Sequence, residues 1–260
     1  MALEYRRPGR AAQSGFARDH TDQAAVSGVQ LGIMRPLILL AIVVALAGDG
    51  IGAQAPGPRA YLVAIDDLHL DFRATPRVRK VLQDLAASGR EEDTYALVTT
   101  GTSSIRLEPT PGVAALRAAV SRITGNGLRE RAHLEASADA NAATEIRHRA
   151  SVSDVTIAEA ITRLARSFSG PPTILYFTDG YDARLVPAMP EVVRTTKDAR
   201  GRMIVVSARD LVPREPPSDV RPAEWRAYLE ATQASLRTLA EQTGGIAVFS
   251  QTELDATLPR

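Results

Sequence analysis

The chain has 260 residues, of which 45% are hydrophobic and 23% charged, proportions that are typical of a globular protein and exclude wholesale disorder. A chain of this length accommodates one ordinary domain or two small ones. Cysteine is absent, which excludes disulfides, thiolate metal sites and a cysteine nucleophile. The formal net charge of +1 gives no indication of a nucleic-acid partner.

A short apolar segment indicates export. The run 37–47 is apolar, a basic residue lies just before it, and small residues follow at Ala53 and Ala55. These are the parts of a secretory signal peptide, which we expect over 34–55, so that the mature protein is periplasmic or extracellular. A retained membrane anchor and a buried helix are the alternatives. The run is shorter than the ~18 apolar residues of a membrane span, and Asp49 interrupts the segment early.

The residues upstream of the signal peptide are expected to lie outside the fold. Residues 1–33 are mostly polar, have no helical or strand periodicity, and precede a second methionine at Met34. We interpret them as a disordered, non-native extension, and an unusually long start of the signal peptide is the alternative. The expected mature domain, 56–260, has 26 basic and 26 acidic residues and is neutral. We expect no nucleic-acid partner, and no membrane contact apart from an uncleaved anchor.

From residue 61 onward, short apolar runs alternate with amphipathic helical patterns. Buried strands are expected at 61–65, 94–100, 173–177, 203–206 and 246–249, with an edge strand at 104–107. Helices are expected at 75–87, 113–123, 153–168 and 252–258, and around 225–239 as a long helix that ends at Gly244 and Gly245. This alternation predicts an α/β fold, a Rossmann-like, doubly wound and mostly parallel sheet flanked by helices.

One polar segment interrupts this alternation. Residues 126–151 are rich in Arg and Glu and poor in large apolar residues, so we expect an irregular or helical insertion over the edge where the parallel strands end. His133 and His148 lie in this insertion, and we expect both to be solvated rather than metal ligands. Trp225 and Tyr228, at helical spacing, are expected in the core.

Carboxylates follow two of the expected strands. Asp66, Asp67 and Asp71 come after the strand at 61–65, and Asp179 comes after the strand at 173–177. Sites in parallel sheets lie beyond the carboxyl ends of the strands. Carboxylate oxygens suit a hard divalent cation such as Mg²⁺ or Mn²⁺. Aspartate is also a common first residue of a loop, so each residue has a structural interpretation beside the metal one.

The order of these segments resembles that of the von Willebrand factor A-type (VWA) domain, most closely its exported bacterial branch, usually labelled VWA-related. The resemblance extends over roughly residues 59–259, nearly all of the expected mature chain. The matching segments are Tyr61–Asp67, Thr94–Thr100, Ile174–Gly180 and Leu236–Phe249. The resemblance implies a Rossmann-like fold and a metal-ion-dependent adhesion site. In the family, that site takes Asp-x-Ser-x-Ser after the first strand, a loop threonine and a later aspartate.

The metal site that the resemblance implies is incomplete in this chain. Its two aspartates fall on Asp66 and Asp179, which would be the remaining metal ligands. The two serines fall on Leu68 and Leu70, which cannot bind a metal, and the loop threonine falls on Val155. The resemblance therefore implies a degenerate site.

Spacing offers a second candidate metal set. Asp67, His69 and Asp71 lie at i, i+2 and i+4, so an extended backbone would point all three side chains the same way. Two carboxylates and an imidazole could hold Mn²⁺ or Zn²⁺. The alternative, which we favour, is that Leu68 and Leu70 are buried while the three polar residues face water.

These patterns favour binding over catalysis. The chain has no P-loop, no Gly-x-Ser-x-Gly and no His-Glu-x-x-His. We expect an exported, non-enzymatic adhesion or scaffold module that binds a protein partner through loops at the edge of the sheet. It would hold no cofactor, or a weakly held Mg²⁺ or Mn²⁺. Two alternatives remain. One is a metal-assisted hydrolase using Asp66, Asp67 and Asp179, with His69 as a further candidate, and the other is an inert structural subunit of an envelope complex.

Overall fold

A computed structural model of the protein describes residues 57–136, 139–186, 188–211 and 215–258. The expected extension at 1–33 and signal peptide at 34–55 lie outside the described residues. By its contacts the chain divides into residues 1–54 and a second unit, Ala55–Arg260, which holds every described helix and strand. Within the described ranges no helix is both long and apolar enough to cross a membrane.

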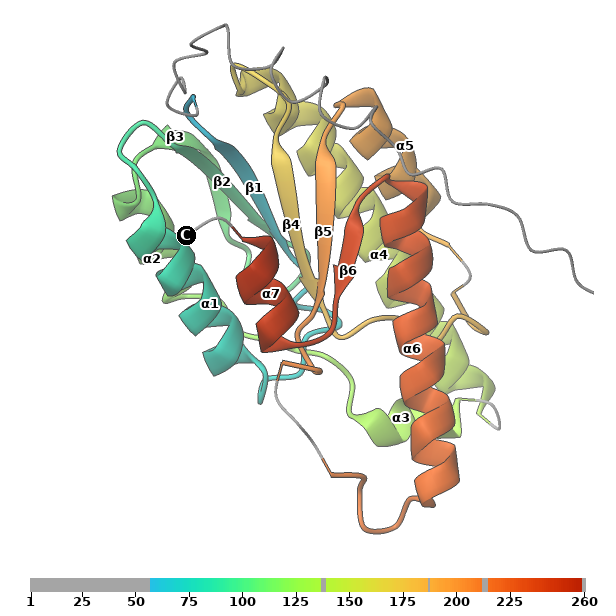
Figure 1. Ribbon diagram of the computed structural model, residues 1–260. Coiled ribbons are helices and arrows are strands. Elements are labelled where there is room, and N and C mark those ends of the chain that lie inside the picture. The colour runs from blue at the N-terminus through green and yellow to red at the C-terminus, as the bar shows by residue number, and fades with distance from the viewer. Residues whose placement is uncertain (1–56, 137–138, 187, 212–214, 259–260) are drawn as a thin grey trace, which may run out of the picture. The chain divides into compact units, whose positions relative to one another are not determined.

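A six-stranded, mostly parallel sheet lies at the centre of the second unit (Figure 1). The parallel strands are β1 (Ala60–Ile65), β2 (Thr94–Thr99), β4 (Thr173–Thr178), β5 (Arg202–Ser207) and β6 (Ile246–Val248). An antiparallel strand, β3 (Arg106–Pro111), pairs with β2. The order β3-β2-β1-β4-β5-β6 confirms the predicted α/β, Rossmann-like fold. The sheet grows from β1 in both directions, so its switch point lies between β1 and β4.

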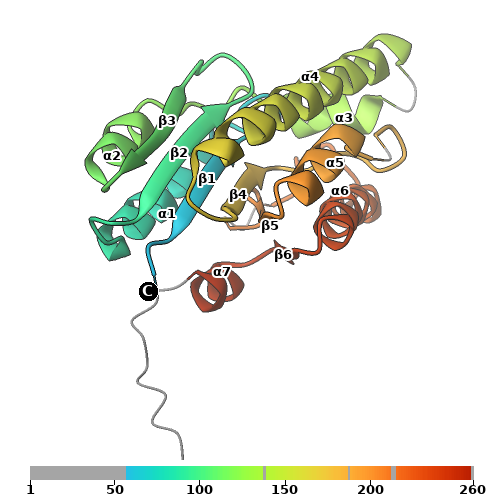
Figure 2. The same ribbon diagram turned by 90° about the horizontal axis from the view of Figure 1, so that it is seen from above.

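Helices cover both faces of the sheet, as Figure 2 shows. One face packs against α1 (Thr75–Ser88), α2 (Ala114–Val120) and α7 (Gln251–Thr257). The other packs against α4 (Ala140–Leu164), α5 (Pro190–Asp198) and α6 (Pro222–Gln242). A short 3-10 helix, η1 (Ala165–Ser167), follows α4, and the small helix α3 (Glu130–Glu135) lies beyond the end of the sheet.

Burial on both faces explains why the strands are continuously apolar. In β1, Tyr61, Val63 and Ile65 pack into the core on one face, and Leu62 and Ala64 pack into the core on the other. A strand between two helical layers has no solvent face, and its sequence therefore shows no polar alternation.

Most of the expected elements are confirmed, with three corrections. The edge strand expected at 104–107 lies at Arg106–Pro111, where prolines are tolerated because an edge strand leaves some N–H groups unpaired. The helix expected at 113–123 ends at Val120. The helix expected at 153–168 begins at Ala140, because the side chain of Asp139 accepts hydrogen bonds from the first turn and starts it earlier.

The long helix ends as predicted. Helix α6 stops at Gln242, and Gly244 follows with a φ of +67°. The backbone N–H of Gly245 then donates to the carbonyl of Ala240 at 2.8 Å, closing the last turn.

Candidate functional site

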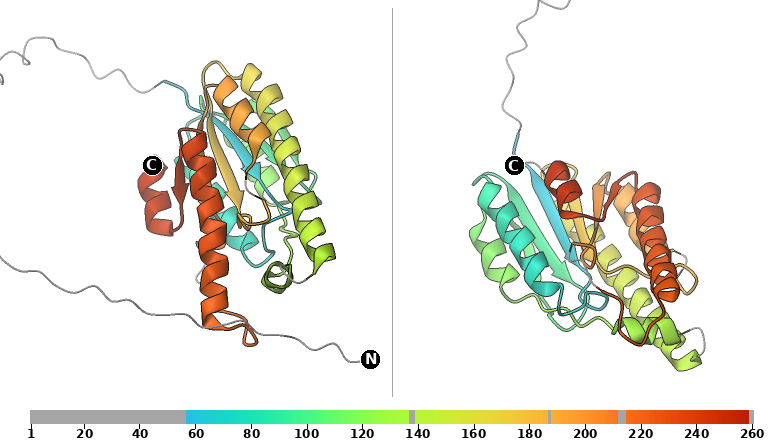
Figure 3. Two further views of the ribbon diagram at one scale, coloured as in Figure 1. Left: turned by 90° about the vertical axis from the view of Figure 1, so that its right-hand side faces the viewer. Right: turned by 60° about the horizontal axis from the view of Figure 1, so that its bottom comes forward.

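The carboxyl ends of the parallel strands meet at one edge of the sheet, which we call the rim (Figure 3, right). We define the rim as the loops 66–74, 100–105, 179–186 and 208–211, with α3 beside them. Ile65 and Phe177 are paired in neighbouring strands. Asp66 and Asp179, which the sequence placed after these two strands, therefore emerge at the same edge.

Asp66 is fully buried at the switch point and makes an unusually large number of hydrogen bonds. Its Oδ1 accepts from Ser153 Oγ at 2.7 Å, Thr100 Oγ1 at 2.9 Å and His69 Nδ1 at 3.0 Å. Its Oδ2 accepts from Tyr176 Oη at 2.8 Å, Thr178 Oγ1 at 3.1 Å and Tyr181 Oη. Both oxygens are thus surrounded by groups that the protein itself supplies.

This arrangement keeps the Asp66 carboxyl ionised. Burial alone raises the pKa of Asp66, but the neighbouring His69 and the hydrogen bonds from His69, Tyr181 and Ser153 outweigh it and hold that pKa well below its usual range. Burial and the Asp66 charge raise the pKa of Tyr176 and Tyr181 well above the usual value, so both phenols stay protonated as donors. An ionised carboxylate only accepts, so the proton between Asp66 and His69 lies on Nδ1.

Asp67 holds the loop 100–105 in place. Its Oδ1 accepts from the backbone N–H of Gly101 at 2.5 Å, and its Oδ2 accepts from the N–H of Ser103 at 2.8 Å. The side chain is fully buried. Asp67 therefore ties the loop after β1 to the loop after β2.

Asp71 and Asp179 join the loops that follow β1 and β4. The N–H of Asp71 donates to Asp179 Oδ2 at 2.9 Å, and the N–H of Asp179 donates to the His69 carbonyl at 3.2 Å. The Asp71 carboxylate accepts from the backbone N–H and the guanidinium of Arg73, which reaches on to Glu130 of α3 at 2.6 Å. The expected metal ligands are thus brought together, but each binds protein groups.

The backbone after β1 corrects the second candidate metal set. The N–H of His69 donates to the Asp66 carbonyl at 3.0 Å, so the chain turns where the prediction assumed an extended strand. The favoured alternative was wrong as well. The three polar residues do not face water: Asp67, His69 and Asp71 are all buried, Leu70 is buried with them, and Leu68 is only partly covered.

These residues do not fit the metal site that the VWA resemblance implies. A cation at Asp66 would have to displace side-chain donors from an oxygen that already accepts three hydrogen bonds. Leucines occupy the positions of the two serine ligands. Across the described ranges, no group of three or more His, Asp or Glu side chains is arranged to hold a metal ion.

His133 corrects the expectation of a solvated insertion. Helix α3 turns its imidazole inward, where it is only 8% exposed and its ring centre lies 5.7 Å from that of Tyr228. The Arg209 guanidinium lies 5.3 Å from the same Tyr228 ring and donates to Thr232 at 2.7 Å. Burial, together with the nearby His69 and Arg209, lowers the pKa of His133 to about 4. His148 is exposed, as expected.

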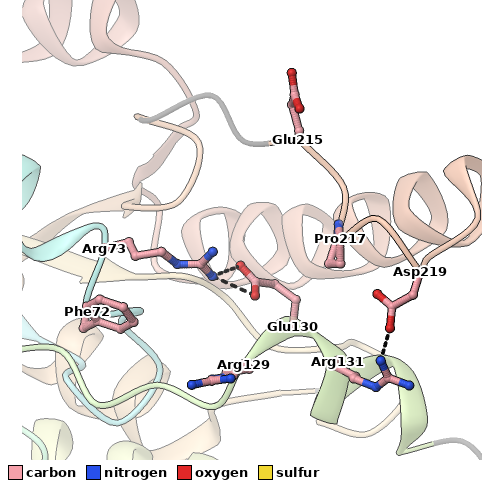
Figure 4. Close-up of a pocket in the computed structure, with 8 residues that line it drawn as sticks. All are labelled: Phe72, Arg73, Arg129, Glu130, Arg131, Glu215, Pro217 and Asp219. Carbon is pink, nitrogen blue, oxygen red and sulfur yellow. Dashed lines mark hydrogen bonds and ion pairs between the residues drawn. The ribbon is translucent and has the colours of Figure 1, made fainter.

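Phe72 is the outstanding exposed feature of the rim. Its side chain is 64% exposed, and Val155 on α4 is the other large apolar residue with high exposure in the described part of the chain. Phe72 lines a pocket of about 350 Å³ that Arg73, Glu130 and Arg129 also line (Figure 4). The Arg73 guanidinium lies 6.0 Å from the centre of the Phe72 ring. Ser153, Tyr176 and Tyr181 were not identified from the sequence as partners of Asp66. The exposure of Phe72 was also missed, because this residue and the two tyrosines look like ordinary core residues.

The chain matches no protein-family model and no curated protein. The resemblance to the VWA domain therefore depends on the order of its elements and on the residues quoted above.

Proposed function

We propose that this protein is an exported, non-enzymatic module that binds a protein partner through its rim, without a metal ion. The observation that carries the proposal is the exposure of Phe72 on a loop whose backbone is fixed from within. Aromatic side chains dominate the binding energy of many protein interfaces. An exposed aromatic beside a pocket is therefore a natural anchor for a partner.

The hydrogen bonds beneath Phe72 support a binding role. Asp71, directly before it, donates through its N–H to Asp179, and the Asp71 carboxylate is held by Arg73. A loop held in this way loses little conformational entropy when a partner docks, which favours affinity. The acidic residues thus act as supports for the loop, in keeping with a module that binds rather than catalyses.

Export is the second part of the proposal and depends on the sequence. The signal-peptide pattern at 34–55 favours a periplasmic or extracellular protein of the VWA-related type. An adhesion or scaffold role fits that location. Residues 56–260 have no net charge, so long-range electrostatic attraction would contribute little to binding. This favours a partner that is recognised by local contacts.

A photo-crosslinking experiment tests the proposal. The photoreactive residue p-benzoylphenylalanine is placed at position 72 or, as the matched control, at position 155 of the full-length protein in the cells that produce it. We expect an adduct with one protein from position 72, none from position 155, and no effect of EDTA. Equal adducts at both positions, or none at 72, would favour an inert structural subunit. Loss of the adduct in EDTA would show that binding needs a metal.

A further inference from the structure

We propose that the partner segment carries a carboxylate beside an apolar side chain, with Arg129 binding the carboxylate and Phe72 packing against the apolar group. This inference rests on the proposed function and names the chemistry of the partner. It comes from the distribution of charge in the pocket at Phe72, where one guanidinium is left available.

The pocket lies between three parts of the chain. Phe72 and Arg73 come from the loop after β1, Arg129 comes from the residue before α3, and Asp219 comes from the segment before α6 (Figure 4). An exposed aromatic and an exposed cation thus line one cavity of about 350 Å³. A cavity of this size admits one or two side chains of a partner rather than a whole folded element.

Most charges in the pocket are neutralised within the protein. Arg73 pairs with Glu130 at 2.6 Å, and Arg131 pairs with Asp219. Arg129 is exposed, and its guanidinium has no hydrogen-bond or ion-pair partner among the described residues. Glu215 also lines the pocket, but Figure 4 shows its carboxylate directed away from the other side chains. The charge left available beside Phe72 is therefore positive.

A carboxylate is the group that this charge distribution fits. The guanidinium fork matches a carboxylate with two parallel hydrogen bonds, and such charge-assisted pairs are stronger than neutral ones. A basic segment would meet the unpaired Arg129. A phosphate would bring up to two negative charges to the single available guanidinium of Arg129, whereas a carboxylate brings one and matches it. An apolar side chain next to the carboxylate would cover the exposed Phe72 ring.

A library of random twelve-residue peptides, displayed on phage and selected on the purified protein, tests this inference. We expect the selected peptides to share an Asp or Glu beside an apolar residue. Synthetic copies should bind Arg129→Ala and Phe72→Ala at least tenfold more weakly than the unchanged protein. Selection on Arg129→Glu should instead enrich Lys or Arg at the acidic position.

The matched controls are Arg166→Ala and Val155→Ala. Both residues are exposed and line a different pocket, between α4 and α5, and the Arg166 guanidinium likewise has no partner among the described residues. Peptides that need Phe72 but lack acidic residues, or that tolerate Arg129→Ala, would overturn the inference and leave the proposed function standing. If no selected peptide depends on Phe72, the inference and the proposed function both fail.

Discussion

Asp66 shows how protein groups alone can stabilise a buried carboxylate. A buried carboxylate is costly unless donors compensate its charge, and here side chains from four separate parts of the chain do so. The hydroxyls of Thr100, Ser153 and Thr178 take part, as do the phenols of Tyr176 and Tyr181. The charge of Asp66 therefore holds the rim together.

Replacing this carboxylate should be severely destabilising. In Asp66→Asn the side chain keeps its size but loses its charge, and its NH₂ group faces donors that then have no acceptor. We expect the free energy of unfolding to fall by about 3–5 kcal/mol, measured by urea denaturation at neutral pH. Asp84→Asn is the control, because Asp84 is 60% exposed and pairs with Lys80 on the surface of α1. Its effect should stay within about 0.5 kcal/mol. A similar small effect at Asp66 would contradict the role assigned to it.

The response to metal ions provides a second test of Asp66. A ligand that binds the native state raises the melting temperature with its concentration. Because both oxygens of Asp66 already accept hydrogen bonds, millimolar Mg²⁺ or Mn²⁺ should leave the melting temperature unchanged, as should EDTA. A rise with Mg²⁺ that disappears in Asp179→Asn would establish a metal site at the rim instead.

The sequence could predict where these aspartates lie but not what they bind. Asp66 and Asp179 follow apolar strands, and parallel strands end at one edge, so their common location could be derived. The hydrogen-bond partners of Asp66 could not be derived from the sequence, because Ser153 lies 87 positions from Asp66 and Tyr176 lies inside an apolar strand. The turn at His69 also escaped prediction, since residue types alone did not distinguish it from an extended segment.

At the scale of elements, a buried histidine is one of the groups that hold α3 in place. His133 packs against Tyr228 of α6 and is placed near Arg209 of the loop after β5. A neutral imidazole fits this position, whereas a protonated one would face the guanidinium of Arg209. Asp182 and Glu130 are the acidic groups near His133, and they reduce this cost without removing it.

Acid should therefore destabilise the protein through His133. The pKa of this residue is about 4 in the folded state and about 6.5 in the unfolded chain, so between these pH values only the unfolded state binds the proton. The contribution of neutral His133 to the free energy of unfolding is fully present above about pH 6.5 and decreases as the pH is lowered toward 4. Between pH 7 and pH 4.5 we expect a loss of about 2–3 kcal/mol that His133→Gln does not show, measured by urea denaturation at each pH. His148→Gln is the control and should follow the unchanged protein. Identical pH profiles for His133→Gln and the unchanged protein would refute this role.

The glycines after α6 allow a different test at this scale. Gly244 has a positive φ and open space where a Cβ would lie, so Gly244→Val should cost about 1–2 kcal/mol through the backbone alone. At Gly245 a Cβ would meet the backbone of Met203, so Gly245→Val should cost more. Gly170→Val is the control, since Gly170 has open space and an ordinary φ. In thermal melting we expect the lowest melting temperature for Gly245→Val, a higher one for Gly244→Val and the highest for Gly170→Val. Equal melting temperatures would contradict this prediction.

The elements that the sequence failed to predict share a cause. Helix α5 has only nine residues, of which Val192, Thr195 and Thr196 are buried, so its apolar pattern is weak. Helix α3 has six residues, and its inward side chains are Glu130 and His133, which usually lie at the surface. Periodicity detects an element through its apolar face, and these two helices bury polar side chains instead. The central strands β1, β2, β4 and β5, buried on both faces, were accordingly the most predictable part.

At the scale of the whole molecule, the last prediction concerns where the mature protein begins. The small residues Ala53 and Ala55 predict cleavage after position 55. The first described contacts start just beyond it: the Gly57 carbonyl accepts from Arg90 at 2.9 Å, and Arg59 pairs with the buried Asp93 at 2.6 Å. Cleavage after Ala55 keeps both contacts, whereas cleavage after Arg59 would leave Asp93 buried without this partner, at a cost of several kcal/mol.

We therefore expect N-terminal sequencing of the exported protein to begin at Pro56. The variant Ala55→Leu lacks the small residue that cleavage needs, so it should stay uncleaved and membrane-bound. Ala60→Ser, five positions further on, is the control and should be processed like the unchanged protein. An exported protein that begins at Met1 or Met34 would refute the signal peptide. A protein found only in the cytoplasm would remove the basis for placing the rim, and any partner bound to Phe72, outside it.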